Sequence, residues 1–142
     1  MPTHPLQDSD ITKCINLCFS CSRSCLETLH YCMEEKGTAF SGKHLSLLQF
    51  CVDACQMTAR LLIAESEFYN QSCELTFELC RACAIECERY EYDEVFQQCA
   101  DICRSCAESC RGMSGMTVRV PKEEIERKRN SSARANGSAA RI

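Results

Sequence analysis

Proline and glycine are scarce in this sequence of 142 residues, which holds three prolines and five glycines. Neither residue occurs in segments 6–36 and 43–111. These long segments therefore lack the residues that most strongly interrupt helices. The alternation of polar and apolar residues that is typical of half-buried strands is missing as well. The sequence predicts an all-α protein.

Long apolar stretches are also absent, and the longest ones present are far too short to span a bilayer. Residues 1–10 contain no basic segment followed by an apolar run, which is the pattern of a secretory signal. We therefore expect a cytoplasmic protein with no membrane partner.

Groupings of catalytic residues are lacking too. The chain shows no paired carboxylates, no nucleophile with a nearby base and no open metal site, so we expect that it is not an enzyme. The formal net charge of −4 is unevenly divided. Residues 1–116 carry 17 acidic and 9 basic side chains, whereas residues 117–142 carry 3 acidic and 7 basic ones. The main body is therefore not basic enough to predict a nucleic-acid partner.

Cysteine, in contrast, is abundant, with fifteen residues in the chain. Roughly one cysteine in ten residues indicates either a disulfide scaffold or a metal protein. In a reducing cytosol structural disulfides are rare, and dense cysteine indicates metal binding. The odd number of cysteines also fits metal binding better than pairing.

Four segments with helical periodicity follow one another, separated by short connections. They cover approximately residues 10–35, 41–65, 69–91 and 93–111. Because short connections make successive helices antiparallel, we expect an up-down-up-down four-helix bundle. The predicted organisation is an N-terminal extension at 1–9, the bundle at 10–116 and a polar, basic tail at 117–142.

The cysteines repeat at spacings of three, four and seven residues, which keep side chains on one stripe of a helix. The stripes consist of Cys14, Cys18, Cys21, Cys25 and Cys32 in the first segment, Cys51 and Cys55 in the second, Cys73, Cys80, Cys83 and Cys87 in the third, and Cys99, Cys103, Cys106 and Cys110 in the fourth. The fourth stripe extends back to Tyr92. Charged residues occupy the other faces, so the cysteines are predicted to line the core. Thiols in place of larger apolar side chains would leave voids unless something that binds sulfur fills them.

The predicted metal is Cu(I), because soft thiolates select it and it accepts low coordination numbers. Two sulfurs about 4.5 Å apart can hold one near-linear ion, a separation that a CxxxC pair can reach on one helix. We expect neutral thiols with raised pKa values in the empty core, and about one bound ion per cysteine. Zinc prefers discrete sets of four ligands, which a continuous ladder of cysteines does not provide. Zinc or cadmium buffering and thiol redox chemistry are the alternatives.

The sequence resembles the cytosolic copper storage proteins, which are cysteine-rich four-helix bundles, over about residues 10–113. The stretches that carry the resemblance are CINLC at 14–18, CVDACQ at 51–56, SEF at 66–68 and CADICRSCAESCR at 99–111. This resemblance implies that Cu(I) ions lie along the bundle axis, bound mainly within CxxxC pairs. It also implies a homo-oligomer, specifically a tetramer. Tyr69 and Thr76 stand where family members often carry His and Cys, which predicts a lower capacity near that end.

Two further residues join the fifteen cysteines as predicted metal ligands. His44 lies on the stripe of Cys51, and Met113 continues the stripe of Cys110. The expected topology puts Cys14, Leu62, Tyr69, Cys73, Cys110 and Met113 at one end of the bundle and Cys32, His44, Cys87 and Tyr92 at the other. The sequence leaves open which end admits the metal.

Overall fold

The computed structural model describes residues 8–35 and 40–114, and these form four helices without a strand in either range. The helices are α1 (Asp8–Glu34), α2 (Gly42–Ile63), α3 (Tyr69–Glu88) and α4 (Glu94–Ser114). The first helix begins two residues earlier than predicted. The rest of the predicted extension and the whole of the predicted tail at 117–142 lie outside the described residues.

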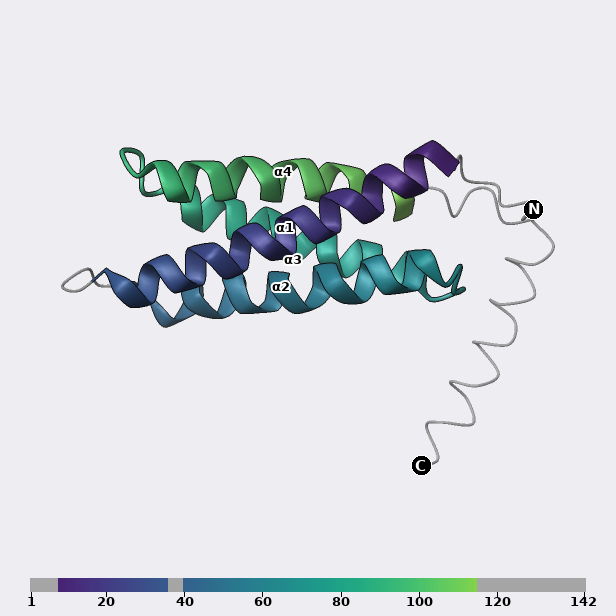
Figure 1. Cartoon of the computed structure of the whole chain (residues 1–142), viewed down its shortest axis with the longest axis horizontal. Helices are drawn as coiled ribbons and strands as arrows, with labels where there is room; N and C mark the ends of the chain where they lie inside the picture. The colour runs from purple at the N-terminus through teal and green to yellow at the C-terminus, as the bar shows by residue number, and fades with distance from the viewer. Residues whose placement is uncertain (1–7, 36–39, 115–142) are drawn as a thin grey trace, which may run out of the picture.

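The four helices lie along one common axis and form a bundle (Figure 1). Each helix packs against two neighbours, so that α1 contacts α2 and α4, and α3 contacts α2 and α4. This arrangement confirms the predicted four-helix bundle. None of the described helices is long and apolar enough to cross a membrane.

Side chains that bind free backbone N–H groups determine where two of the helices begin. The hydroxyl of Ser41 accepts a hydrogen bond from the backbone N–H of His44 at 3.0 Å, which caps α2. The carboxylate of Asp93 accepts from the N–H groups of Val95 and Phe96 at 3.0 and 3.4 Å, at the start of α4. Both caps use a residue directly before the first turn, so the starting register of each helix follows from its sequence.

The connection between α3 and α4 corrects one prediction. The third helix ends at Glu88, three residues earlier than expected, and the N–H of Asp93 closes a turn on the carbonyl of Tyr90 at 3.1 Å. Tyr92 therefore lies in this turn and is 99% exposed, so its predicted place on the inward stripe is wrong. Phe96, which is 1% exposed, takes the inner position instead.

The centre of the bundle is built from sulfur. All fifteen cysteines are buried and none forms a disulfide. Larger buried side chains, among them Leu62 and Met113 at one end and His44 and Phe96 at the other, lie beyond the central cysteines. The prediction that the cysteines share the bundle axis is therefore confirmed, and disulfide bridges do not explain their number.

Candidate metal centre

The thiols of the core lie close enough to share hydrogen bonds or a common ion. Many sulfur-to-sulfur distances in the core fall between 3.7 and 4.0 Å. Most of these contacts join different helices, such as Cys25 to Cys103 at 3.7 Å, and Cys55 to Cys80 at 3.7 Å. Cys21 and Cys25, at 4.0 Å, are neighbours on α1. The sulfurs therefore pair mainly across helices, whereas the family resemblance implies copper pairs within one helix.

The sulfurs gather into small sets that share members. The sets whose sulfurs lie within 4.8 Å of one another are Cys21, Cys55, Cys80 and Cys106; Cys14, Cys18 and Cys110; Cys21, Cys25 and Cys103; and Cys25, Cys51 and Cys83. Because Cys21 and Cys25 each belong to two sets, three of the sets merge into a continuous lattice. Three sulfurs around one ion lie about 4.0 Å apart when each metal–sulfur bond is about 2.3 Å. The sulfur spacings of the lattice are therefore close to those around three-coordinate ions.

The set of Cys21, Cys55, Cys80 and Cys106 corrects an argument against zinc. We expected no discrete group of four thiols, and the structure holds one. Three of its sulfur-to-sulfur distances, at 3.7–3.8 Å, match the roughly 3.8 Å edge of a tetrahedral site with bonds of about 2.3 Å. Zinc is therefore opposed by charge, not by the arrangement of the ligands.

Charge in the core favours a monovalent ion. Zn²⁺ bound by four thiolates leaves a net charge of −2, whereas one Cu⁺ per thiolate leaves none. Every Lys and Arg among the described residues is exposed, so no buried cation balances a negative site. An uncompensated charge in a fully buried site is costly. The lattice as a whole is therefore better suited to Cu(I).

The thiols do not share one direction of pKa shift. Burial raises the pKa of Cys32 to about 11. Hydrogen bonds with Cys106 and Cys21 raise the pKa values of Cys80 and Cys103, respectively, well above the ordinary range. A hydrogen bond with Cys103 lowers the pKa of Cys21, and a hydrogen bond with Cys103 also lowers the pKa of Cys99. The prediction of uniformly raised values is therefore wrong for Cys21 and Cys99, because neighbouring thiols can donate hydrogen bonds to a thiolate.

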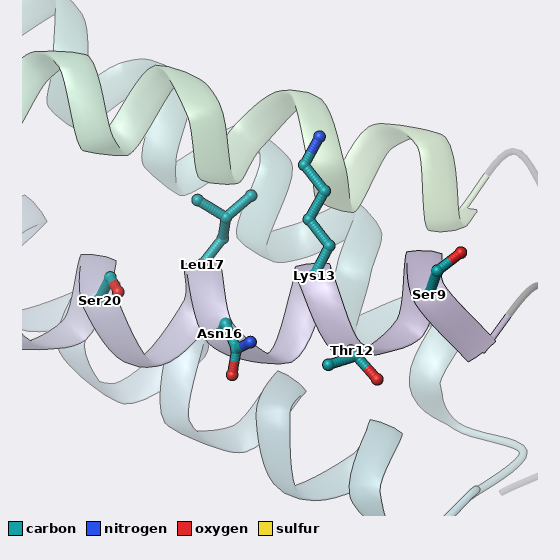
Figure 2. Close-up of a pocket in the computed structure, with 6 residues that line it drawn as sticks. All are labelled: Ser9, Thr12, Lys13, Asn16, Leu17 and Ser20. Atoms are coloured by element: carbon teal, nitrogen blue, oxygen red, sulfur yellow. The ribbon is translucent and has the colours of Figure 1, made fainter.

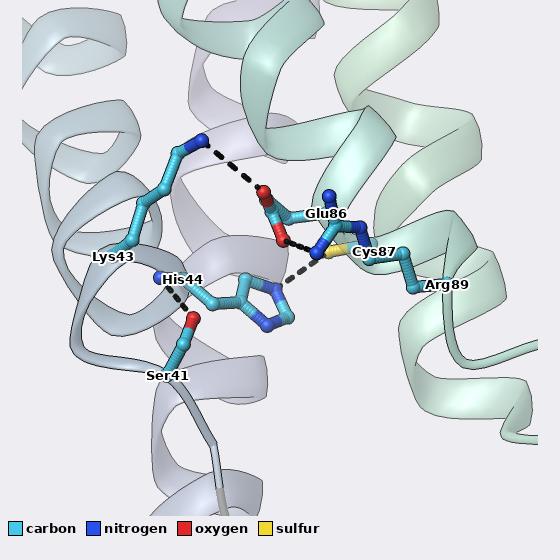
Figure 3. A network of polar contacts seen from close by, with 6 residues as sticks. All are labelled: Ser41, Lys43, His44, Glu86, Cys87 and Arg89. Atoms are coloured by element: carbon cyan, nitrogen blue, oxygen red, sulfur yellow. Dashed lines mark hydrogen bonds and ion pairs between the residues drawn. The ribbon is translucent and has the colours of Figure 1, made fainter.

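His44 borders the sulfur lattice near the start of α2. Its Nε2 lies 3.3 Å from the sulfur of Cys87 (Figure 3). The imidazole is fully buried. Its ring centroid lies 5.5 Å from that of Tyr90 and 5.3 Å from that of Phe96. Burial lowers the pKa of His44, which favours the neutral form that binds metal ions. The Nδ1 atom is buried without a hydrogen-bond partner, so Nε2 is the nitrogen that faces sulfur.

A buried carboxylate, Glu86, lies in the same region and was missed by the sequence analysis. Its side chain is 8% exposed and forms ion pairs with Lys43 at 3.5 Å and Arg89 at 3.4 Å (Figure 3). The signal for it was its position, three residues after Cys83 and one before Cys87, at the edge of the inward stripe. Because two cations neutralise it, this carboxylate does not add net negative charge to the end of the core.

Hydroxyl groups replace sulfur at one level of the bundle, between α2 and α3. The Oγ1 atom of Thr58 lies 2.8 Å from that of Thr76 and 2.6 Å from the Oγ of Ser72. The Thr76 hydroxyl also donates to the carbonyl of Ala54 at 3.3 Å. Both threonines are fully buried. Thr76, which stands where family members often carry Cys, thus belongs to a network of hydrogen-bonded hydroxyl groups. This network interrupts the sulfur lattice on one side.

Comparison with known proteins agrees with this arrangement of thiols. The sequence profile described as copper storage protein matches residues 7–115. The chain belongs to the copper storage protein family. The matched residues include all four helices and every cysteine. The resemblance seen in the sequence is therefore confirmed.

Three relatives of this copper storage family member illustrate the match. The uncharacterized cysteine-rich protein YhjQ of Bacillus subtilis (strain 168) is 32% identical over 101 residues, which are 71% of this chain and 93% of that protein. The Cu(I)-bound copper storage protein BsCsp3 superposes with a TM-score of 0.71 at 30% identity, covering 74% of this chain and 98% of the other. The copper storage protein Ccsp of Streptomyces lividans, loaded with 10 copper equivalents, superposes with a TM-score of 0.71 at 26% identity. The match covers 80% of this chain and 93% of the other.

The predicted ligands of this copper storage family member are thus placed as follows. The fifteen cysteines and His44 line one continuous buried column. Met113 is 2% exposed and continues the stripe of Cys110 at the opposite end from His44. Their role as metal ligands stays a prediction, and eleven of the cysteines belong to sets whose sulfurs lie within 4.8 Å of one another.

Proposed function

We propose that this protein stores Cu(I) in the core of its bundle, with each ion held by two or three thiolates. The observation that carries the proposal is the sulfur-lined core, in which all fifteen cysteines are buried without disulfides and many sulfurs lie within 3.7–4.0 Å of another sulfur. Soft, closely spaced sulfur ligands of this kind select Cu(I). The cysteines, His44 and Met113 are the proposed ligands.

Loading exchanges protons for metal. Each neutral thiol that binds Cu⁺ releases one proton, and the charge of the core does not change. If each sulfur bridges two ions and each ion takes two sulfurs, the capacity is about one ion per cysteine. Sites with three sulfurs reduce this number slightly. The bundle is therefore suited to hold many ions without accumulating charge.

Storage in place of catalysis and a cytoplasmic location are parts of the same proposal. All fifteen cysteines are buried and many of their sulfurs neighbour other sulfurs, so a bound ion would be enclosed by protein ligands and would have no position facing a substrate. Free thiols at this density fit a reducing compartment. The Streptomyces lividans protein loaded with five coppers, 26% identical to this chain, is described as cytosolic, which supports the same location here. We expect neither a membrane nor a nucleic acid as partner.

Self-association through the outer face of α1 and α2 is also proposed. Phe19 and Leu26 on α1, and Phe50 and Met57 on α2, are each about half exposed. The hydroxyl of Ser22 donates to the carbonyl of Val52 at 3.2 Å, where α1 packs against α2. We take the four exposed side chains as an apolar patch on these two helices, and exposed apolar surface of this kind is typical of an interface. A second copy of the chain is the proposed occupant, in agreement with the tetramer that the family resemblance implies.

The oligomer can be tested by light scattering coupled to size-exclusion chromatography. Phe50→Glu should dissociate the assembly, because it places a charge in the patch. Leu75→Glu, at a similarly exposed position on α3, is the matched control and should leave the mass unchanged. A monomeric wild-type protein, or a Phe50→Glu variant of undiminished mass, would contradict the proposal.

Copper storage itself can be tested in cells that express the protein. Replacing Cys21, Cys25 and Cys103 by Ala removes the members of one central set. We expect this variant to lower both cellular copper tolerance and the copper recovered with the protein. Ser105, Ser109 and Ser114 replaced by Ala serve as a control with the same number of substitutions. Unchanged tolerance and copper content in the cysteine variant would argue against storage.

Zinc buffering is the second candidate, and the set of Cys21, Cys55, Cys80 and Cys106 is the observation that favours it. A competition experiment separates the two ions. The reduced protein is first saturated with Zn²⁺ and then titrated with Cu(I) without oxygen. We expect Cu(I) to release all zinc, and zinc retained against excess Cu(I) would favour the alternative.

A further inference from the structure

A surface groove lies between the start of α1 and the end of α4. It has a volume of about 500 Å³, and its lining includes Lys13 and Leu17 from α1 and Glu108 and Met113 from α4. Figure 2 shows the side chains of Lys13 and Leu17 extending from α1 toward α4. Its charged residues have both signs, so the groove does not select a ligand by charge. Met113 is the residue of the groove lining that carries sulfur.

Met113 belongs both to this groove and to the buried core. The side chain is 2% exposed, yet it lines the groove. It follows Cys110 by three residues on the same helix, so the two side chains are neighbours on one face. The thioether therefore lies between the surface and the thiols.

Three thiols lie directly behind this position. The sulfur of Cys110 is 3.8 Å from that of Cys14 and 3.9 Å from that of Cys18, and the three form one compact set. Cys18 contacts Cys106 at 3.8 Å, which connects the set to the larger lattice. On the other side of the bundle the hydroxyls of Thr58 and Thr76 occupy the corresponding level. The set is thus distinct from the lattice and joined to it along the α1–α4 side.

The opposite end of the bundle is packed with aromatic rings. The ring centroid of Phe96 lies 4.4 Å from that of Tyr90 and 5.4 Å from that of Phe40. His44 is fully buried behind these rings, so they separate its contact with Cys87 from the surface. Passage of an ion there would require displacing tightly packed side chains.

We propose that Cu(I) enters the protein through the groove at Met113, with the Met113 thioether as its first ligand and the set of Cys14, Cys18 and Cys110 as its acceptor site. This inference rests on the proposed storage of Cu(I) and adds the route by which the ions reach the lattice.

The order of ligands follows from their chemistry. A thioether carries no proton, so it binds Cu⁺ without first being deprotonated. One thiol then forms a Cu–S bond and loses its S–H proton to water, and the bond to the previous ligand breaks. The oxidation state of copper does not change, and no oxidant or reductant is needed. In the next exchange the Cys106 thiol forms the new Cu–S bond and its proton passes to the Cys18 sulfur as the Cu–S bond of Cys18 breaks, so the ion moves into the lattice and the core stays neutral.

The rate of loading tests the role of Met113. Reduced full-length protein is mixed without oxygen with Cu(I) held by excess chloride, and thiolate-to-copper absorbance is followed in the ultraviolet. Met113→Leu should load about tenfold more slowly, as expected when one stabilising ligand is lost from the passage. Its final copper content should fall by no more than the single ion that Met113 itself holds. Met33→Leu, an exposed methionine near the other end of α1, is the matched control and should load at the wild-type rate.

A second variant blocks the groove without removing a ligand. Leu17→Trp places a larger ring from α1 beside Met113, and we expect it to slow loading while the final copper content is unchanged. Normal loading rates in both Met113→Leu and Leu17→Trp would overturn the proposal. Helical circular dichroism of each variant shows whether the fold is retained.

The location of the first ions provides an independent test. About one equivalent of Cu(I) is added, the thiols are alkylated within seconds, and the protected positions are identified by peptide mass spectrometry. Protection of Cys14, Cys18 and Cys110 before Cys32 and Cys87 is expected. Protection that begins at Cys32 and Cys87 would overturn the entrance and leave storage intact, whereas a wild-type protein that retains few ions would contradict storage itself.

Discussion

The hydroxyl oxygens of Thr58 and Thr76 lie 2.8 Å apart in the centre of the bundle, at a level where sulfur would continue the lattice. The Oγ of Ser72 lies 2.6 Å from the Oγ1 of Thr58, and the Thr76 hydroxyl donates a hydrogen bond to the carbonyl of Ala54 at 3.3 Å. The network satisfies buried hydroxyls that would otherwise destabilise the core. It also removes two positions from the column of proposed copper ligands.

Restoring sulfur at this level should increase the copper capacity. Thr76→Cys places a thiol between the lattice and the set of Cys14, Cys18 and Cys110, and we expect it to add about one bound ion. Thr76→Val has nearly the same shape and supplies no ligand, so its capacity should equal that of the wild type. Anaerobic titration with Cu(I) measures both. An unchanged capacity in Thr76→Cys would mean that this level is closed to metal.

The contact between His44 and Cys87 predicts one mixed nitrogen and sulfur site. His44→Leu keeps an apolar side chain against Tyr90 and Phe96 but removes the nitrogen, and we expect about one fewer bound ion. His30→Leu is the control, because His30 is exposed on the outer face of α1. Equal copper contents in the two variants would show that His44 only fills the end of the core.

The ion pairs of Glu86 should contribute more to stability than those at the surface. Glu86→Gln leaves a nearly buried amide without its two cationic partners, and we expect a loss of about 1 kcal/mol in the free energy of unfolding. Glu88→Gln breaks a contact with Arg104 of 2.6 Å at a half-exposed position, and should cost less than about 0.5 kcal/mol. Urea unfolding of the metal-free variants measures both, and a larger loss for Glu88→Gln would be contrary to this expectation.

Copper binding should weaken as the pH falls. Burial raises the pKa of Cys32 to about 11, so this thiol is protonated throughout the range from pH 6 to 8. Copper must displace that proton, and the affinity of such a site should therefore rise about tenfold per pH unit for each proton released. Competition with a chelator, corrected for the chelator's own protonation, measures the change. Affinity that does not depend on pH would show that the bound thiols were already ionised.

The bundle and its inward cysteines could be predicted because their periodicity is carried by many residues at once. Spacings of three, four and seven place all fifteen cysteines on inner faces whatever the details of packing, and the structure agrees. Helix ends depend on single local interactions, and these were less predictable. The Asp93 cap and the turn after Glu88 moved Tyr92 out of the core and put Phe96 into it.

Relationships between helices could not be derived from spacing along one helix. The thiol set of Cys21, Cys55, Cys80 and Cys106 joins all four helices, and its existence depends on the relative heights of the helices. The same holds for the network around Thr58, and for Glu86, whose two cationic partners lie on α2 and after the end of α3. Directions of pKa shift depend on which thiol donates to which, so the lowered pKa of Cys21 required the positions of its neighbours.

The number of Cu(I) ions bound per chain is the most direct test of the central claim. The fully reduced protein is titrated without oxygen against a competing Cu(I) chelator, and copper and thiols are measured in the same sample. The lattice predicts that binding continues until about one ion is held per cysteine. Saturation after only three or four ions would contradict the account.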